Sequence, residues 1–279
     1  MTNYNKVSFS IFLTLMLFSL AAMATGPRVT QSMLVAVENE MFAVDAPPFI
    51  SLAETEGGLN AEIVKSALAA VEIKSTLTVL PVVKMVNYYL YEEQALAVYD
   101  RHMSFSGDEK SLIYVPVFHM RENYFYSKFH HKSDLNWKGK LDDLSGLTYG
   151  AHRGENISVY EKAGIKVVFA RHNILVKKLA AGEVDFIQMP TLTRDWMLEH
   201  DASIQQYHFA AMKAETELAP QFIVFNKNNP EGKKIAEKLK QGLQVILSNG
   251  KYENILKRYL HEGVDVEARV EALSQLIKQ

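Results

Sequence analysis

The sequence predicts an α/β protein made of two units, because two stretches alternate between strand and helix patterns. Short apolar or alternating runs are separated by segments with helical apolar spacing, first over residues 33–99 and again over residues 147–200. This alternation is typical of βαβ units with parallel sheets. A length of 279 residues, of which 48% are hydrophobic, is sufficient for one large or two smaller globular cores.

The first 24 residues have the plan of a secretory signal peptide. Lys6 precedes an apolar run over residues 7–20, and Ala22, Met23 and Ala24 form an A-x-A cleavage signal. The alternative is a membrane anchor, but the run is shorter than the roughly 20 apolar residues that a bilayer requires. We therefore expect cleavage after Ala24. The chain has no Cys, so neither disulfides nor a lipid-modified cysteine is expected, and the expected location is a bacterial periplasm.

The first unit is expected to contain three strands, two helices and a rigid loop. Two adjacent prolines, Pro47 and Pro48, exclude helix and sheet interior from the loop over residues 42–50, which carries Phe49 at its tip. Pro81 is favourable at the start of the helix that follows it. The expected strands span residues 33–37, 75–80 and 95–99, and the expected helices span residues 59–70 and 82–91.

The second unit repeats the alternation after a connection over residues 100–120, which we expect to be irregular because Gly107 and Pro116 act as breakers. An aromatic strand is expected over residues 121–128. The remaining strands are expected at residues 147–151, 166–169, 185–189 and 221–226. The remaining helices are expected at residues 157–163, 173–181, 192–200, 230–248, 252–260 and 268–278.

A tight turn over residues 153–156 joins a predicted strand directly to a predicted helix. Such a joint points several unpaired backbone N–H groups at one spot, which favours a carboxylate or a phosphate. Arg153, Glu155 and Asn156 are therefore candidate ligand-binding residues. Alternatively, Arg153 is a solvated turn residue and Glu155 only stabilises the helix N-terminus.

Six segments follow one another in an order that is similar to a known family. They span residues 46–49, 58–63, 79–84, 144–154, 179–185 and 247–259. These segments resemble the extracytoplasmic solute-binding proteins of family 3, the periplasmic receptors of polar amino-acid uptake systems. The resemblance implies a two-lobed periplasmic binding protein type II fold, in which each lobe is a mostly parallel sheet flanked by helices and a hinge joins the lobes. It also implies a first lobe over residues 25–116, a second over 117–220 and a return to the first over 221–279.

The ligand-binding positions of this family are only partly matched. Members that bind α-amino acids clamp the carboxylate with an Arg, where this chain has Glu109 followed by Lys110, and Lys lacks the planar fork of Arg. Members also hold the amino group with an Asp, where residues 186–190 contain no carboxylate. An amino-acid ligand therefore does not follow from the fold. The candidate ligand-binding residues are Phe49, Ser104, Ser106, Lys110, Arg153, Glu155, Asn156 and Gln188.

A binding protein is the leading hypothesis. A small polar solute, either amino-acid-like or another small anion or zwitterion, would enter a cleft between the lobes, which close around it by a hinge. The partner would be an inner-membrane ABC permease or a sensor domain, and a monomer is expected. One alternative is a periplasmic enzyme of the dehydratase or lytic type, for which Glu155 is the one strand-end carboxylate on offer. Another alternative is an orphan or sensory protein with an altered ligand.

Other function classes find little support in the sequence. A net charge of -2, with Lys and Arg spread along the chain, argues against nucleic acid as the main partner. His130 and His131 are adjacent and would face opposite sides of a strand, so a metal site is not expected. The sequence has no phosphate-binding loop, dinucleotide glycine pattern or nucleophile elbow, so no cofactor is expected.

Overall fold

The computed structural model describes residues 40–80, 96–99, 111–131, 135, 137–152, 155, 157–212, 218–260 and 265–278. These residues belong to one compact unit, Glu38–Gln279. The expected signal peptide, the strand expected over residues 33–37 and the helix expected over residues 82–91 lie outside the described residues. Within the described ranges, no helix combines the length and the apolar character needed to cross a membrane.

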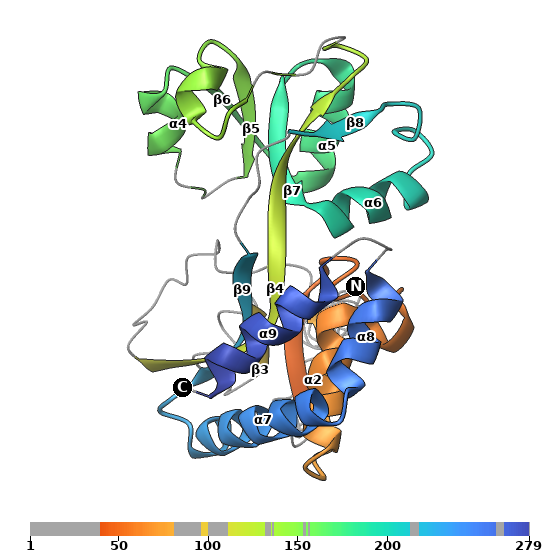
Figure 1. The fold of residues 1–279 in the computed structure, drawn as a ribbon, viewed down its shortest axis with the longest axis vertical. Coiled ribbons are helices and arrows are strands. Elements are labelled where there is room, and N and C mark those ends of the chain that lie inside the picture. The colour runs from red at the N-terminus through yellow and green to blue at the C-terminus, as the bar shows by residue number, and fades with distance from the viewer. Residues whose placement is uncertain are drawn as a thin grey trace, which may run out of the picture. The chain divides into compact units, whose positions relative to one another are not determined.

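The strands form one mixed sheet in the order β2-β1-β3-β9-β4-β7-β5-β6, with β8 paired to β4 (Figure 1). The strands are β1 (Glu40–Val44), β2 (Thr76–Leu80), β3 (Leu96–Tyr99), β4 (Leu112–Ser127), β5 (Thr148–His152), β6 (Lys166–Ala170), β7 (Phe186–Pro190), β8 (Phe209–Ala211) and β9 (Leu218–Asn226). The helices are α2 (Leu59–Ala69), α4 (Ser158–Lys162), α5 (His172–Ala181), α6 (Thr191–His200), α7 (Pro230–Ser248), α8 (Lys251–Tyr259) and α9 (Val266–Ile277), with short 3-10 turns η2 (Thr55–Gly57) and η4 (Leu141–Leu144).

Strand pairing divides this sheet into two lobes that share one strand. In the first lobe, β1 pairs in parallel with β2 and β3, and β9 is added antiparallel to β3. In the second lobe, β5 pairs in parallel with β6 and β7, and β4 is added antiparallel to β7. The first half of β4 pairs with β9 and its second half pairs with β7 and β8, so this strand runs through both lobes (Figure 1).

The irregular connection predicted over residues 100–120 is wrong from residue 112 onward, because these residues form the first part of β4. Pro116 has no N–H to donate to a neighbouring strand. The pairing of β4 with β9 shifts register between Pro116 and Phe118, and this local irregularity accommodates the proline within the strand. The loop predicted to start at residue 42 is also wrong at its start, because β1 continues to Val44 between β2 and β3. Strand β8 was not predicted.

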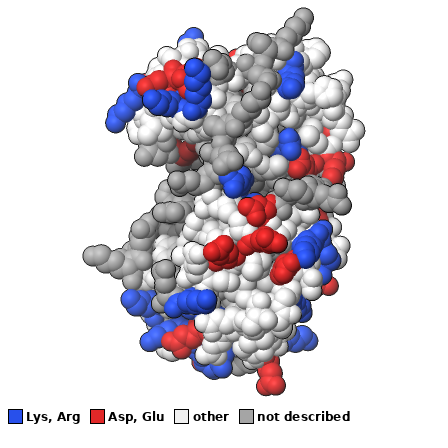
Figure 2. Space-filling model, viewed as in Figure 1, with Lys and Arg blue, Asp and Glu red and all other residues white. Residues whose placement is uncertain are grey.

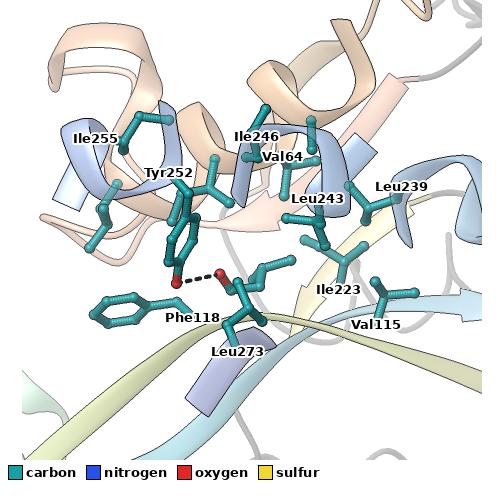
Figure 3. Close-up of a cluster of buried hydrophobic side chains, with 14 of the residues drawn as sticks. Val64, Val115, Phe118, Ile223, Leu239, Leu243, Ile246, Tyr252, Ile255 and Leu273 are labelled. Atoms are coloured by element: carbon teal, nitrogen blue, oxygen red, sulfur yellow. Dashed lines mark hydrogen bonds between the residues drawn. The ribbon is translucent and has the colours of Figure 1, made fainter. Parts of the chain in front are cut away.

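The core of the first lobe consists of apolar side chains from α2, α7, α8 and α9 together with β4 and β9 (Figure 3). Residues drawn in Figure 3 include Val64, Val115, Phe118, Ile223, Leu239, Leu243, Ile246, Tyr252, Ile255 and Leu273. The buried hydroxyl of Tyr252 donates to the carbonyl oxygen of Val117 at 3.2 Å. Helices α2 and α7 approach closely at Gly242, where a Cβ atom would lie 1.9 Å from the carbonyl oxygen of Ala67. No larger residue fits there unless one of the two helices moves.

The second lobe buries one cluster on each face of its sheet. Successive strand residues point to opposite faces, so Tyr124 and Phe186 belong to one cluster whereas Phe125 and Ile187 belong to the other. The first cluster lies beneath α4, whose Tyr160 is part of it. The second cluster is covered by apolar residues of α5 and α6. The predicted counterparts of β5, α4, β6, α5, β7 and α6 agree with the observed elements to within one or two residues at their ends.

Candidate functional site

The parallel strands β5, β6 and β7 end at the same edge of the second lobe, which is where ligands bind in open α/β sheets. Glu155 follows the end of β5 and folds back onto it. Its Oε1 atom accepts a hydrogen bond from the Tyr149 hydroxyl at 2.7 Å, and its Oε2 atom accepts one from the backbone N–H of His152 at 3.0 Å. The Glu155 carboxylate therefore fixes the turn between β5 and α4.

Three tyrosines form a hydrogen-bonded group beside this turn, here called the tyrosine cluster (Tyr124, Tyr149 and Tyr160). The rings of Tyr149 and Tyr160 are stacked, with centroids 4.2 Å apart. The Tyr160 hydroxyl donates to Oε1 of Gln188 at 3.1 Å and lies 2.8 Å from the Tyr124 hydroxyl. Because Tyr160 has one hydroxyl proton, which Gln188 accepts, Tyr124 is the donor in the bond between the two tyrosines.

The tyrosine cluster is held in its neutral form. Burial raises the pKa of Tyr149, and the nearby Tyr160 and Glu155 raise it further. Burial is also the main cause of the raised pKa values of Tyr160 and Tyr124. At the end of β5, burial lowers the pKa of His152 and favours the neutral imidazole. Glu122 lies opposite Pro190 at the end of β7, and its charge acts on His152 and Tyr124. The site therefore combines neutral hydroxyl, amide and imidazole groups with two carboxylates, a set of groups suited to hydrogen-bonding a polar molecule.

Helix α6 starts directly where β7 ends, with Pro190 as the residue before its first turn. Proline provides no side-chain acceptor for the first backbone N–H groups of the helix. The start of α6 is fixed from β4 instead, because Nδ2 of Asn123 donates to Oγ1 of Thr191 at 2.6 Å. Gln188 lies on the same strand end, and its register partner on β4 is Tyr124.

The architecture is similar to that of solved ligand-binding proteins. A GluR0 ligand-binding core from Nostoc punctiforme, solved with L-glutamate, matches with a TM-score of 0.60 and 15% identity over 80% of this chain and 99% of that one. An arginine transport-system periplasmic binding protein from Legionella pneumophila matches with a TM-score of 0.60 and 14% identity over 80% and 99%. The VFT2 domain of BvgS from Bordetella pertussis matches with a TM-score of 0.60 and 16% identity over 85% and 99%. No protein-family model and no curated protein matches the sequence.

The likeness extends over almost the whole length of each of these three structures. The chain has the fold of a type II periplasmic binding protein. The two-lobed α/β architecture that the sequence predicts is thereby confirmed. At identities of 14 to 16%, the likeness shows the fold and leaves the ligand to the chemistry of this chain's own residues.

Two of the residues predicted to bind a ligand come together in this binding-protein fold. Glu155 and Gln188 are linked through the tyrosine cluster, since Tyr149 donates to Glu155 and Tyr160 donates to Gln188. Phe49 lies elsewhere, in the core of the first lobe, with 7% of its surface exposed and its ring centroid 5.9 Å from that of Phe118. The other candidates lie outside the described residues and stay predictions: Ser104, Ser106, Lys110, Arg153 and Asn156.

The three tyrosines themselves were not among the predicted site residues. A signal for them exists in the strand pattern, because Tyr149 and Ala151 alternate on the face of β5 that is buried beneath α4. That pattern predicts burial, but it does not indicate which hydroxyl meets which partner. Tyr124 and Tyr160 are 36 residues apart in the sequence, so their contact depends on tertiary packing.

The adjacent histidines have separate partners. Nε2 of His130 lies 2.7 Å from the carbonyl oxygen of Ala180, whereas Nε2 of His131 lies 3.0 Å from Oδ1 of Asp185. Asp185 also accepts from the backbone N–H of Thr148 at 2.7 Å, which ties this pair to the sheet. Among the described residues, no group of three or more His, Cys, Asp or Glu side chains is arranged to hold a metal ion.

Proposed function

We propose that this protein is a periplasmic solute-binding protein that captures a small polar solute between its lobes and delivers it to an ABC-type permease. The observation that carries the proposal is the type II binding-protein fold, matched over 99% of a ligand-binding core solved with L-glutamate and of an arginine transport-system binding protein. The motifs in chain order that resemble family 3 point to the same role. The proposed solute is amino-acid-like or another small anion or zwitterion.

The chemistry of the strand-end edge supports binding over catalysis. An enzyme on this scaffold needs a carboxylate or imidazole placed to transfer a proton to or from a substrate. Two carboxylates lie at this edge, those of Glu155 and Glu122. Both oxygens of Glu155 already accept hydrogen bonds from Tyr149 and His152, and the charge of Glu122 acts on the buried His152. The neighbouring tyrosines have raised pKa values because they are buried, so they serve as hydroxyl donors and acceptors near neutral pH.

The ligand is proposed to differ from a standard α-amino acid. The family's amino-group position falls within residues 186–190, the strand β7, which contains no carboxylate and ends with Pro190 directly before α6. Its carboxylate-binding Arg position falls on Glu109, beside Lys110. A solute that is held mainly by hydroxyl and amide groups, with one charged contact, fits the residues of this chain better than one that needs two charged clamps.

A sensory role with an altered ligand is the second candidate, because Glu109 and residues 186–190 do not supply the two charged clamps of the amino-acid receptors. In that case the closed chain would contact a sensor domain in place of a permease. In either role, the proposed location is the periplasm after cleavage behind Ala24. The face drawn in Figure 2 has Lys and Arg in small groups beside Asp and Glu, in keeping with the net charge of -2 and with a small solute as the ligand.

A thermal-shift screen of the mature protein tests the proposal. The panel consists of amino acids, polyamines, organic acids and sugars, each titrated to millimolar concentration. A solute that binds only the folded chain raises the melting temperature in a dose-dependent manner. The shift is expected to shrink in Gln188→Leu and Arg153→Ala, and to be retained in Gln205→Leu, whose side chain is exposed on the second lobe. The absence of any dose-dependent shift across all four classes would contradict the proposal.

A further inference from the structure

Helix α6 of the second lobe makes contacts with the first lobe at two places. Leu192, in its first turn, packs against the apolar core of the first lobe. One turn further on, Nε1 of Trp196 donates to Oε1 of Glu54 at 2.6 Å. Glu54 and Trp196 are 142 residues apart in the sequence: Glu54 lies in the loop between β1 and α2 of the first lobe, and Trp196 lies in α6 of the second. The position of α6 thus couples the two lobes.

The Glu54 end of this contact is fixed by the loop over residues 51–58. Backbone bonds close the loop on itself: the N–H of Ser51 donates to the carbonyl of Gly57 at 2.9 Å, and the N–H of Gly57 donates to the carbonyl of Glu54 at 3.0 Å. Glu56 has a φ of 56°, a left-handed conformation that is unfavourable for a residue with a side chain. From α8, the Tyr259 hydroxyl donates to the carbonyl of Thr55 at 2.9 Å. The carboxylate of Glu54 is therefore presented by a preorganised loop.

The Trp196 end is fixed just as closely. Its indole is stacked on the imidazole of His200, with centroids 4.3 Å apart and planes 12° apart. Nδ1 of His200 lies 2.8 Å from the carbonyl oxygen of Trp196, so the stack is held to the helix backbone. Arg194 anchors the same helix in the second lobe, with its guanidinium 4.8 Å from the centre of the Phe125 ring and Nη1 donating to the carbonyl of Phe209 at 3.3 Å.

We infer that the Trp196–Glu54 hydrogen bond is a latch, which holds the two lobes in contact in the absence of a solute. Both partners are partly exposed, so water replaces either one when the bond opens, and the contact forms and breaks at little cost. Two preorganised groups that meet through a single charge-assisted bond are suited to such a reversible contact. The latch deepens the proposed function, because it favours the arrangement with the two lobes in contact even when no solute is bound.

This bias has a consequence for binding. A solute that binds the arrangement with the lobes in contact has an apparent affinity that is reduced by the fraction of chains in other arrangements. A latch raises the population of the binding-competent arrangement before any solute arrives. The inference deepens the proposed function, but its test uses ligand-free protein, so failure of one does not imply failure of the other.

The chain offers a matched pair of variants for this test, because Trp137 and Trp196 are its two tryptophans. Nε1 of Trp137 donates to the carbonyl of Lys140 at 3.0 Å, a bond that stays within the second lobe. Trp196→Phe and Trp137→Phe therefore lose the same N–H group, but only the first loses a contact between lobes. Small-angle X-ray scattering of the ligand-free chain is expected to show a larger radius of gyration for Trp196→Phe and an unchanged value for Trp137→Phe.

Tryptophan fluorescence tests the same hydrogen bond by substitution of its acceptor, Glu54. In Trp137→Phe, Trp196 is the sole tryptophan, and adding Glu54→Ala is expected to shift its emission to longer wavelength and to increase quenching by acrylamide. Glu56→Ala, two residues away on the same loop, serves as the control and is expected to leave both quantities unchanged. An unchanged radius of gyration in Trp196→Phe together with unchanged Trp196 emission in Glu54→Ala would overturn the latch. A lower melting temperature without a change in the radius of gyration would overturn it as well.

Discussion

The first lobe is packed with aliphatic side chains from four helices, whereas the second lobe has three hydrogen-bonded tyrosines at its centre. The two lobes share the same plan of parallel strands extended by antiparallel ones, so the topology does not account for the difference. In the first lobe, α2 and α7 are brought together by Gly242, and the contact is purely steric. In the second lobe, Tyr149 and Tyr160 connect the interior to the strand-end edge through Glu155 and Gln188.

This difference in core composition indicates that the two lobes have different roles. A close-packed apolar core stabilises one arrangement of helices and tolerates few changes in volume. A buried hydroxyl network adds directionality, because each donor must meet its acceptor, and an unmet partner is costly. The second lobe therefore extends a rigid polar framework to the edge where a solute is proposed to bind, and the first lobe supplies a stable base. Four substitutions test whether the two cores differ in this way.

The largest effect is expected from Gly242→Ala in the first lobe. The new Cβ atom would lie 1.9 Å from the carbonyl oxygen of Ala67, so α7 must move away from α2 along with the core between them. We expect the free energy of unfolding to fall by about 3 kcal/mol or more, as measured by urea denaturation. Gly250→Ala is the control: it has open space around the new atom and a φ of 77°, so about 1 kcal/mol is expected. Equal losses in the two variants would contradict the steric account.

Tyr160→Phe in the second lobe keeps the stacked ring and removes the hydroxyl. Tyr124 then loses its acceptor and Gln188 loses its donor. We expect a loss of about 2 kcal/mol in the free energy of unfolding, because two partners of one hydroxyl are left unmet. Tyr207→Phe, at a half-exposed ring stacked on Phe209, should cost less than about 0.5 kcal/mol. If Tyr160→Phe were as mild as this control, the tyrosine cluster would not act as a network.

His119 is buried in the first lobe, and its titration tests how apolar the surroundings of its imidazole are. Burial, with a further contribution from Arg269, lowers the pKa of His119 from 6.5 to about 4. An unfolded chain would bind a proton on this residue below pH 6.5 while the folded chain does not. Stability is therefore fully present above pH 6.5 and is lost as the pH falls toward 4, by about 3 kcal/mol. Denaturation curves at pH 7, 5.5 and 4 measure this. His119→Phe lacks this group, so the free energy of unfolding of the wild type minus that of the variant should be lower at pH 4 than at pH 7; a difference that does not change with pH would refute the assignment.

Tyr149→Phe is expected to have the smallest effect of the four. Glu155 loses one donor at Oε1 but keeps the backbone N–H of His152 at Oε2, and water reaches this partly exposed carboxylate. We expect a cost of about 1 kcal/mol in the free energy of unfolding. Because the turn after β5 is loosened, we expect a clear loss of affinity for the solute together with only a small fall in the melting temperature. A parallel loss of both would indicate that Tyr149 has only a packing role.

Most helices and strands could be predicted from the sequence, because the apolar periodicity that indicates them is a local pattern along the chain. Helix α7 agrees with its prediction over residues 230–248 at both ends, where Pro230 starts it and Asn249 and Gly250 follow it. Strand β4 was missed over residues 112–120, because a proline that normally breaks strands is accommodated by the register shift beside it.

The candidate site could be predicted only in part. The turn after β5 was located because a strand that meets a helix through Gly has a recognisable local pattern, and Glu155 lies in it. The partners of Glu155 and Gln188 were not predictable, because a hydroxyl network depends on which side chains the folded sheet brings together. The contact between Glu54 and Trp196 spans both lobes and has no local signal at all.

Isothermal titration calorimetry with the solute that gives the largest thermal shift measures whether the chain captures a solute and how many it takes up. We expect saturable binding of one solute per chain, with a negative heat-capacity change because surface is buried when the lobes close. We also expect Gln188→Leu to weaken this binding and Gln205→Leu to leave it unchanged. Unsaturable heats, or binding to several weak sites per chain, would contradict the claim that this fold captures a solute in one cleft.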